Sequence, residues 1–229
     1  MNWIFDNLFS LIAAIVVLTL VLRIRRRIMR SVHSRRIGAY ALPVTLKNKV
    51  HKRYPHLDDD QLALVMTGLK EYFQLCNVAG KRPVAMPSQV VDVAWHEFIL
   101  FTRKYQDFCR QSLGRFLHHT PAEAMRSPTQ AQEGIKRAWR IACAREGINA
   151  KTPATLPLLF AIDQQLAISD GFFYRPDCSA LIAAAESRGD STPYCASHIG
   201  CSSGCSGSGG CTSSCSSGDS GCSSGCGGD

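Results

Sequence analysis

The chain has 229 residues, of which 45% are hydrophobic and 19% are charged, and its formal net charge is +8. Seven arginines lie between residues 23 and 36, and the chain after this run carries 19 basic residues against 17 acidic residues. Because the positive charge is confined to one short segment, the rest lacks the basic face of a nucleic-acid-binding domain, and we expect no nucleic-acid partner.

The first predicted element is a transmembrane anchor over residues 1–22, followed by a basic juxtamembrane segment over residues 23–36. Trp3 to Leu22 is an apolar run of 20 residues, which as a helix would span roughly 30 Å, the hydrocarbon thickness of a bilayer. A cleaved signal peptide would need a basic start and a small-residue cleavage site, and both are absent here.

Basic residues flank this predicted anchor on one side only. The positive-inside rule therefore predicts a single-pass protein of a bacterial inner membrane, with its N-terminus outside and its remaining residues in the cytoplasm. In that compartment the 11 cysteines should be mostly reduced. The flanking residues are Arg23, Arg25, Arg26, Arg27 and Arg30.

Residues 37–190 are predicted to form a compact all-α domain. Acidic residues at 58–60 should begin a helix that ends at Gly80, and Pro87-Ser88 should open a longer helix that runs to about residue 112. Further helices are expected over about 129–146 and 154–168. Residues 171–176 should be extended or form a packed loop.

The tail over residues 191–229 consists almost entirely of Ser, Gly and Cys, and it is predicted to be disordered because it has almost nothing to bury. Three C-x-x-x-C pairs within it could hold a structural zinc ion or bind soft metal ions loosely, or the tail could be a plain flexible segment. These cysteines are Cys201, Cys205, Cys211, Cys215, Cys222 and Cys226.

The long helix carries the candidate site. Asp92 and His96 are separated by four residues, so their side chains should meet on one helix face. A carboxylate that fixes one imidazole nitrogen leaves the other free as a metal ligand or a base. Thirteen residues of helix would place Cys109 about 20 Å from His96. A turn near residues 112–115 could instead bring His118 or His119 back to that histidine.

Three interpretations of this site remain open from the residues alone. Asp92, His96, His118 and His119 could be structural polar residues, a metal or small-ligand site with the three histidines as ligands and zinc as the ion, or a catalytic centre. Position 100 is leucine, so the H-E-x-x-H zincin motif is absent.

These residues resemble a known family signature. The block Asp92-x-x-Trp95-His96, followed by Tyr105, Cys109 and His118-His119-x-Pro121, is similar to that of the glycine-rich domain-containing protein family and its bacterial relatives. The resemblance covers about residues 60–125. It implies interaction or regulatory functions without a defined enzymatic activity. Trp95 and Tyr105 belong to an apolar stripe at helical spacing, and we expect Trp95, Tyr105 and Cys109 to pack the motif. Plant members carry W-H-x-H, whereas Phe98 replaces the second histidine here.

The sequence therefore predicts a membrane-anchored, non-enzymatic protein that presents a helical interaction domain to a protein partner, with a small polar or metal site around His96. One alternative is a metal-dependent hydrolytic enzyme that uses His96 and His118 or His119. Another is a soft-metal-handling protein that uses the cysteines of the tail.

Overall fold

The computed structural model describes the backbone of residues 2–119 and 128–176, and the side chains of residues 11–119 and 132–176. The described residues form helices and no strand, which confirms the predicted all-α fold. The predicted tail, with its six paired cysteines, lies outside the described residues. The helices are α1 (Asn2–Ala39), α2 (Val44–Arg53), α3 (Asp59–Ala79), α4 (Gln89–Ile99), α5 (Thr102–Phe108), the π-helix η1 (Cys109–Leu113), α6 (Pro128–Glu146) and α7 (Leu158–Gln165).

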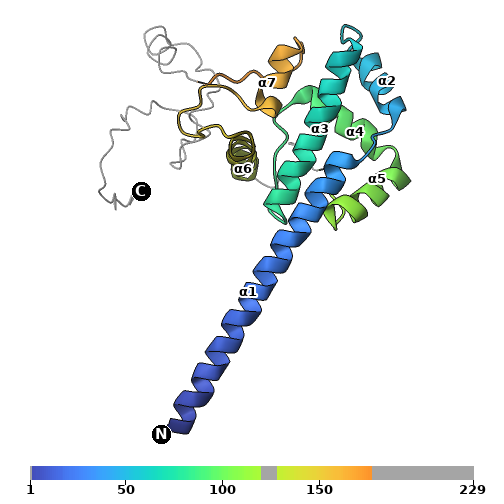
Figure 1. Cartoon of the computed structure of the whole chain (residues 1–229). Coiled ribbons are helices and arrows are strands. Elements are labelled where there is room, and N and C mark those ends of the chain that lie inside the picture. The colour runs from blue at the N-terminus through green and yellow to red at the C-terminus, as the bar shows by residue number, and fades with distance from the viewer. Residues whose placement is uncertain (1, 120–127, 177–229) are drawn as a thin grey trace, which may run out of the picture.

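Helix α1 is a single long helix whose N-terminal half projects from the body (Figure 1). It joins the predicted anchor and the predicted basic segment without a break. None of the described helices has the length and apolar character needed to cross a membrane. The prediction of a single-pass inner-membrane protein is therefore wrong.

Helix α3 begins and ends as its sequence predicts. The Asp58 carboxylate accepts a hydrogen bond from the Gln61 backbone N–H at 2.7 Å, and the Gln61 side chain accepts one from the Asp58 backbone N–H at 3.0 Å. This capping box satisfies two backbone donors at the helix start. Gly80 ends the helix with φ +65°. Helix α2 was not predicted, because Pro43 at its N-cap supplies no side-chain hydrogen bond to mark its start.

The predicted helix over residues 87–112 is not continuous. Helix α4 ends at Ile99, Phe101 has the non-helical angles φ −79° and ψ 53°, and α5 then runs into η1. The break allows the Trp95 indole N–H to donate to the Tyr105 hydroxyl at 3.1 Å. In a straight helix, ten residues would separate these two positions by about 15 Å.

The two later helices differ in how closely they match their predicted bounds. Helix α6 begins at Pro128 and ends at Glu146, as expected. Helix α7 is shorter than predicted because Pro157 is extended, with ψ 152°, and the helix begins only after it. The segment after α7 is a packed loop, in which the ring of Tyr174 lies 4.9 Å from that of Phe160.

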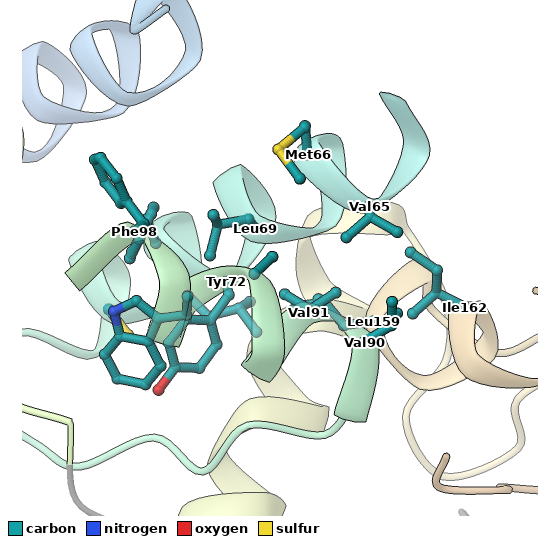
Figure 2. Packing of buried hydrophobic residues seen from close by; sticks show 14 of the residues in the cluster. Val65, Met66, Leu69, Tyr72, Val90, Val91, Phe98, Leu159 and Ile162 are labelled. Atoms are coloured by element: carbon teal, nitrogen blue, oxygen red, sulfur yellow. The ribbon is translucent and has the colours of Figure 1, made fainter. Parts of the chain in front are cut away.

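The core lies where α3 packs against α4 and α7 (Figure 2). Gly68 permits the close approach, because a Cβ there would lie 3.0 Å from Val91 Cγ2 and 3.3 Å from Ile162 Cδ1. The packed side chains fix the position of α4 and therefore of the polar residues on its outer face. The labelled core residues are Val65, Met66, Leu69, Tyr72, Val90, Val91, Phe98, Leu159 and Ile162.

A buried carboxylate on α7 holds the start of α4. Asp163, which is 1% exposed, accepts hydrogen bonds from the Ser88 hydroxyl at 2.7 Å and from the backbone N–H groups of Gln89 and Val90 at 2.7 and 3.3 Å. It also accepts one from the Phe172 N–H at 2.9 Å. Backbone donors at a helix N-terminus favour a negative charge, so these contacts compensate for its burial.

We expect Asp163→Ala to lower the free energy of unfolding by about 3 kcal/mol, because it leaves several buried donors without an acceptor. Urea denaturation of the full chain would measure the loss. Asp107→Ala is the matched control, since Asp107 only pairs with Arg110 on the surface, and it should change the free energy by less than about 0.5 kcal/mol. Equal losses in both variants would contradict the role of Asp163.

Candidate functional site

Three polar side chains meet on the outer face of α4. Asp92 Oδ2 lies 3.1 Å from His96 Nδ1, and Asp92 Oδ1 lies 3.1 Å from His119 Nε2. The two imidazole rings are close to each other, with centroids 3.9 Å apart. One potential ligand atom from each of the three residues lies within 4.8 Å of the other two. The structure therefore gathers one carboxylate and two histidines into a single cluster.

The three residues of the cluster differ in their exposure. The side chain of His96 is 50% exposed, whereas those of Asp92 and His119 are 23% and 14% exposed. Behind them lies Trp95, which is 3% exposed and whose ring centroid is 4.7 Å from that of His119. An ion or small ligand could reach the cluster from the side of His96.

The chain returns to α4 through a sharp turn after η1. Gly114 ends the π-helix in the left-handed conformation, with φ +66° and ψ 8°, which a glycine adopts without strain. The Arg115 guanidinium then donates to the Gly80 carbonyl at 2.6 Å. This contact ties the returning segment to the end of α3 and directs it toward Asp92.

A buried hydroxyl holds the same segment two residues before His119. Tyr105 accepts a hydrogen bond from Trp95 Nε1 and donates one to the Leu117 carbonyl at 2.5 Å. Burial raises the pKa of Tyr105 far above its ordinary value, so the hydroxyl keeps the proton that it donates to Leu117. Trp95 and Tyr105 thus connect α4 to the loop that carries His119.

The structure does not bring the other predicted residues into the cluster. The His118 ring packs against Phe116 at 4.8 Å instead. Cys109 is buried, and burial raises the pKa of its thiol, which disfavours the thiolate that binds metals. Glu97, which follows His96 and was not predicted as a site residue, pairs with Lys49 at 2.6 Å. The tail cysteines, from Cys201 to Cys226, lie outside the described residues.

The spacing of the cluster suits a transition metal. Zinc binds nitrogen and oxygen ligands at about 2.0–2.2 Å in tetrahedral geometry, which places neighbouring ligand atoms about 3.3 Å apart. Each histidine nitrogen lies 3.1 Å from a different oxygen of the Asp92 carboxylate, and one ligand atom from each residue lies within 4.8 Å of the other two. A neutral imidazole can carry its proton on either nitrogen, so the nitrogens that face Asp92 can bind a metal once the proton has moved to the other nitrogen.

Sequence reasoning missed the residues that set the position of His119. Arg115 was not singled out, and Tyr105 was assigned only to packing, although both hold the returning segment through hydrogen bonds. The sequence signal for these roles is the spacing Arg115-x-Leu117-x-His119, because alternate residues of an extended segment point to the same side.

A family model described as UCP032817-like matches residues 32–199. The matched range includes the whole Asp92, His96 and His119 cluster. The resemblance to the glycine-rich domain-containing family is therefore wrong, since it depended on a short motif within this longer match. No curated protein and no solved structure matches the chain.

We expect Tyr105→Phe to destabilise the protein by about 1–3 kcal/mol, because it leaves the buried Trp95 N–H and Leu117 carbonyl without their partner. Chemical denaturation would measure the change, and the Trp95 indole proton should shift in the NMR spectrum. Tyr40→Phe is the control, since no described residue is hydrogen-bonded to the Tyr40 hydroxyl. Equal stability of Tyr105→Phe and Tyr40→Phe would contradict a stabilising role of the Tyr105 hydroxyl between Trp95 and Leu117.

Proposed function

Because this chain belongs to the UCP032817-like family, whose description specifies no activity, we propose its function from the site itself. The helical domain binds one divalent transition-metal ion through Asp92, His96 and His119. The observation that carries this proposal is the convergence of three ligand atoms within 4.8 Å of one another.

The chemistry of the ligands favours a first-row transition metal. Imidazole nitrogen suits zinc, copper, iron and nickel, whereas calcium and magnesium prefer sites built from oxygen alone. Two histidines and one carboxylate supply three ligands, which leaves a coordination position for water on the exposed side of His96. Zinc is therefore the first ion to test.

The surroundings of the cluster favour a stable binding site. A metal-bound histidine needs its ring held in a fixed orientation, and the Trp95 ring and the Leu117 contact hold His119 in this way. Without a metal, His96 is held by its own helix, since its Nδ1 lies 2.9 Å from the Asp92 carbonyl oxygen; a metal bound at this nitrogen would replace that hydrogen bond. Both histidines are thus positioned by the fold before an ion arrives.

The proposal is for binding and not for hydrolysis. In metalloproteases a glutamate general base acts beside the zinc site. The adjacent carboxylate, Glu97, is paired with Lys49, and Asp92 is itself a ligand. We therefore propose that the domain is a non-enzymatic module whose metal site supports interaction with a partner protein.

Metal content of the purified full chain tests the proposal. We expect His96→Ala and His119→Ala each to lose about one equivalent of zinc relative to the unchanged protein, because two remaining ligands hold zinc weakly. His118→Ala is the matched control, since this neighbouring histidine packs against Phe116, and it should retain the metal. Mass spectrometry of the metals after dialysis provides the measurement.

Cobalt substitution separates this site from the tail. Cobalt bound by imidazole and carboxylate gives visible bands without the sulfur charge-transfer absorption of thiolate ligands. We expect the visible bands to disappear in His119→Ala and to persist when the six paired tail cysteines, from Cys201 to Cys226, are replaced by serine. Metal that is lost only in the cysteine variant would contradict the proposal. Full retention of metal in His96→Ala and His119→Ala would also contradict it.

A further inference from the structure

A second concave site lies between the C-terminal half of α1 and the end of α3. The groove has a volume of about 380 Å³, and Leu113 and Arg115 also line it. It shares no lining residue with the Asp92 cluster. Its walls come from α1, from the end of α3 and from residues 113–115, which are far apart in the sequence.

The lining of this groove is strongly basic. Five side chains with a permanent positive charge and one histidine line it, and no carboxylate does. A concave surface with charges of one sign concentrates the electrostatic field and attracts ions of the opposite sign. The basic residues are Arg25, Arg26, Arg30, His33, Lys81 and Arg115.

The cations of the groove have no acidic partner. Within the described part of the chain, none of the groove's arginines or lysines forms an ion pair with a carboxylate. Their mutual repulsion is therefore not relieved by acidic neighbours, and a bound anion would relieve it.

The walls of the groove are fixed by specific contacts. The Asn77 amide donates to the Arg30 carbonyl at 3.0 Å, and the Gln74 amide donates to the Ser34 carbonyl at 2.9 Å. Both side chains are buried and hold α1 against α3. Arg115 is fixed by the Gly80 carbonyl at 2.6 Å. The basic side chains thus extend from a rigid frame.

His33 is a partly buried residue of this frame. A Cβ on Gly114 would lie 3.0 Å from His33 Cε1, so the glycine makes room for the imidazole. Burial, together with the positive charge of Arg36, lowers the pKa of His33, which favours the neutral imidazole.

We propose that this groove binds a phosphate group. Arginine guanidinium groups present paired N–H donors that match the oxygens of phosphate, and several of them together can compensate for its two charges. Leu22, Met29 and Leu113 add an apolar surface beside the cations. The ligand is therefore either free phosphate or a phosphate that carries an apolar group, such as the headgroup of an anionic lipid.

Isothermal titration calorimetry of the full chain tests the proposal with two probes, inorganic phosphate and a short-chain, water-soluble phosphatidic acid. EDTA is present so that a metal at the Asp92 cluster makes no contribution, and sodium chloride keeps the ionic strength constant. Tighter binding of phosphatidic acid than of phosphate would identify the lipid headgroup as the source. Equal affinities would identify free phosphate.

The double substitution Arg26→Gln/Arg30→Gln should weaken binding of the phosphate probe by about tenfold or more, since it removes two charge-assisted contacts. The matched control, Arg35→Gln/Arg103→Gln, removes the same charge from exposed positions outside the groove and should change the affinity by less than about twofold. In the unchanged protein, phosphate should also shift the NMR signals of the His33 ring.

Three results would overturn the proposal. The first is that neither probe binds the unchanged protein. The second is an equal loss of affinity in the two double variants, which would show that only net charge matters. The third is arginine-dependent binding of a single-stranded oligonucleotide without binding of either phosphate probe, which would identify a nucleic-acid surface instead.

Discussion

The placement of α4 depends on one buried carboxylate. Asp163 reaches from α7 to the first turn of α4 and binds the Ser88 hydroxyl and two backbone N–H groups there. The Ser88 oxygen in turn accepts from the Val91 N–H at 3.2 Å. A buried charge is costly unless it is fully hydrogen-bonded, and here the unpaired donors of a helix N-terminus supply the bonds. Because the helix is fixed at its start, Asp92 and His96 one and two turns later have defined positions.

The helical fold could be predicted because it follows from local signals. The capping residues of α3 and the apolar periodicity of α4 are both visible in the sequence. The break at Phe101 was not predictable in this way, because Phe98, Phe101 and Tyr105 continue a helical apolar pattern across it. The break allows the hydrogen bond between Trp95 and Tyr105, which the local apolar pattern does not specify. Tertiary packing thus overrides the local pattern at this point.

Contacts between distant parts of the chain also determine the surroundings of the arginines. The arginines after residue 22 were interpreted as the flank of a membrane span, since their spacing along the chain was the only available information. In the structure, Arg25, Arg26 and Arg30 line a groove with Lys81 and Arg115. Lys81 follows α3 and Arg115 follows η1, and both are 50 or more residues away from these arginines in the sequence, so no local pattern could connect them. The buried amides Gln74 and Asn77, which fix the groove, carry no distinctive sequence signal either.

The returning segment determines that His119, and not His118, lies in the candidate metal site. From Arg115 to His119 the residues alternate in burial: Phe116 and His118 are exposed, whereas Leu117 is buried and Arg115 and His119 are partly buried. Alternation of this kind is typical of extended backbone, in which successive side chains point to opposite sides. The hydrogen bond from the Tyr105 hydroxyl to the Leu117 carbonyl fixes the register, that is, which residues of this segment face the domain.

A shift of this segment by one residue would place His118 against Asp92 and expose Leu117 to solvent. Exposure of a leucine side chain would cost about 2 kcal/mol, and the shift would also move Arg115 away from the Gly80 carbonyl. The hydrophobic burial of Leu117 therefore selects which histidine faces Asp92. The same register directs Arg115 toward the basic groove. The extended segment thus positions His119 in the candidate metal site and Arg115 at the basic groove. Burial of Leu117 determines both positions.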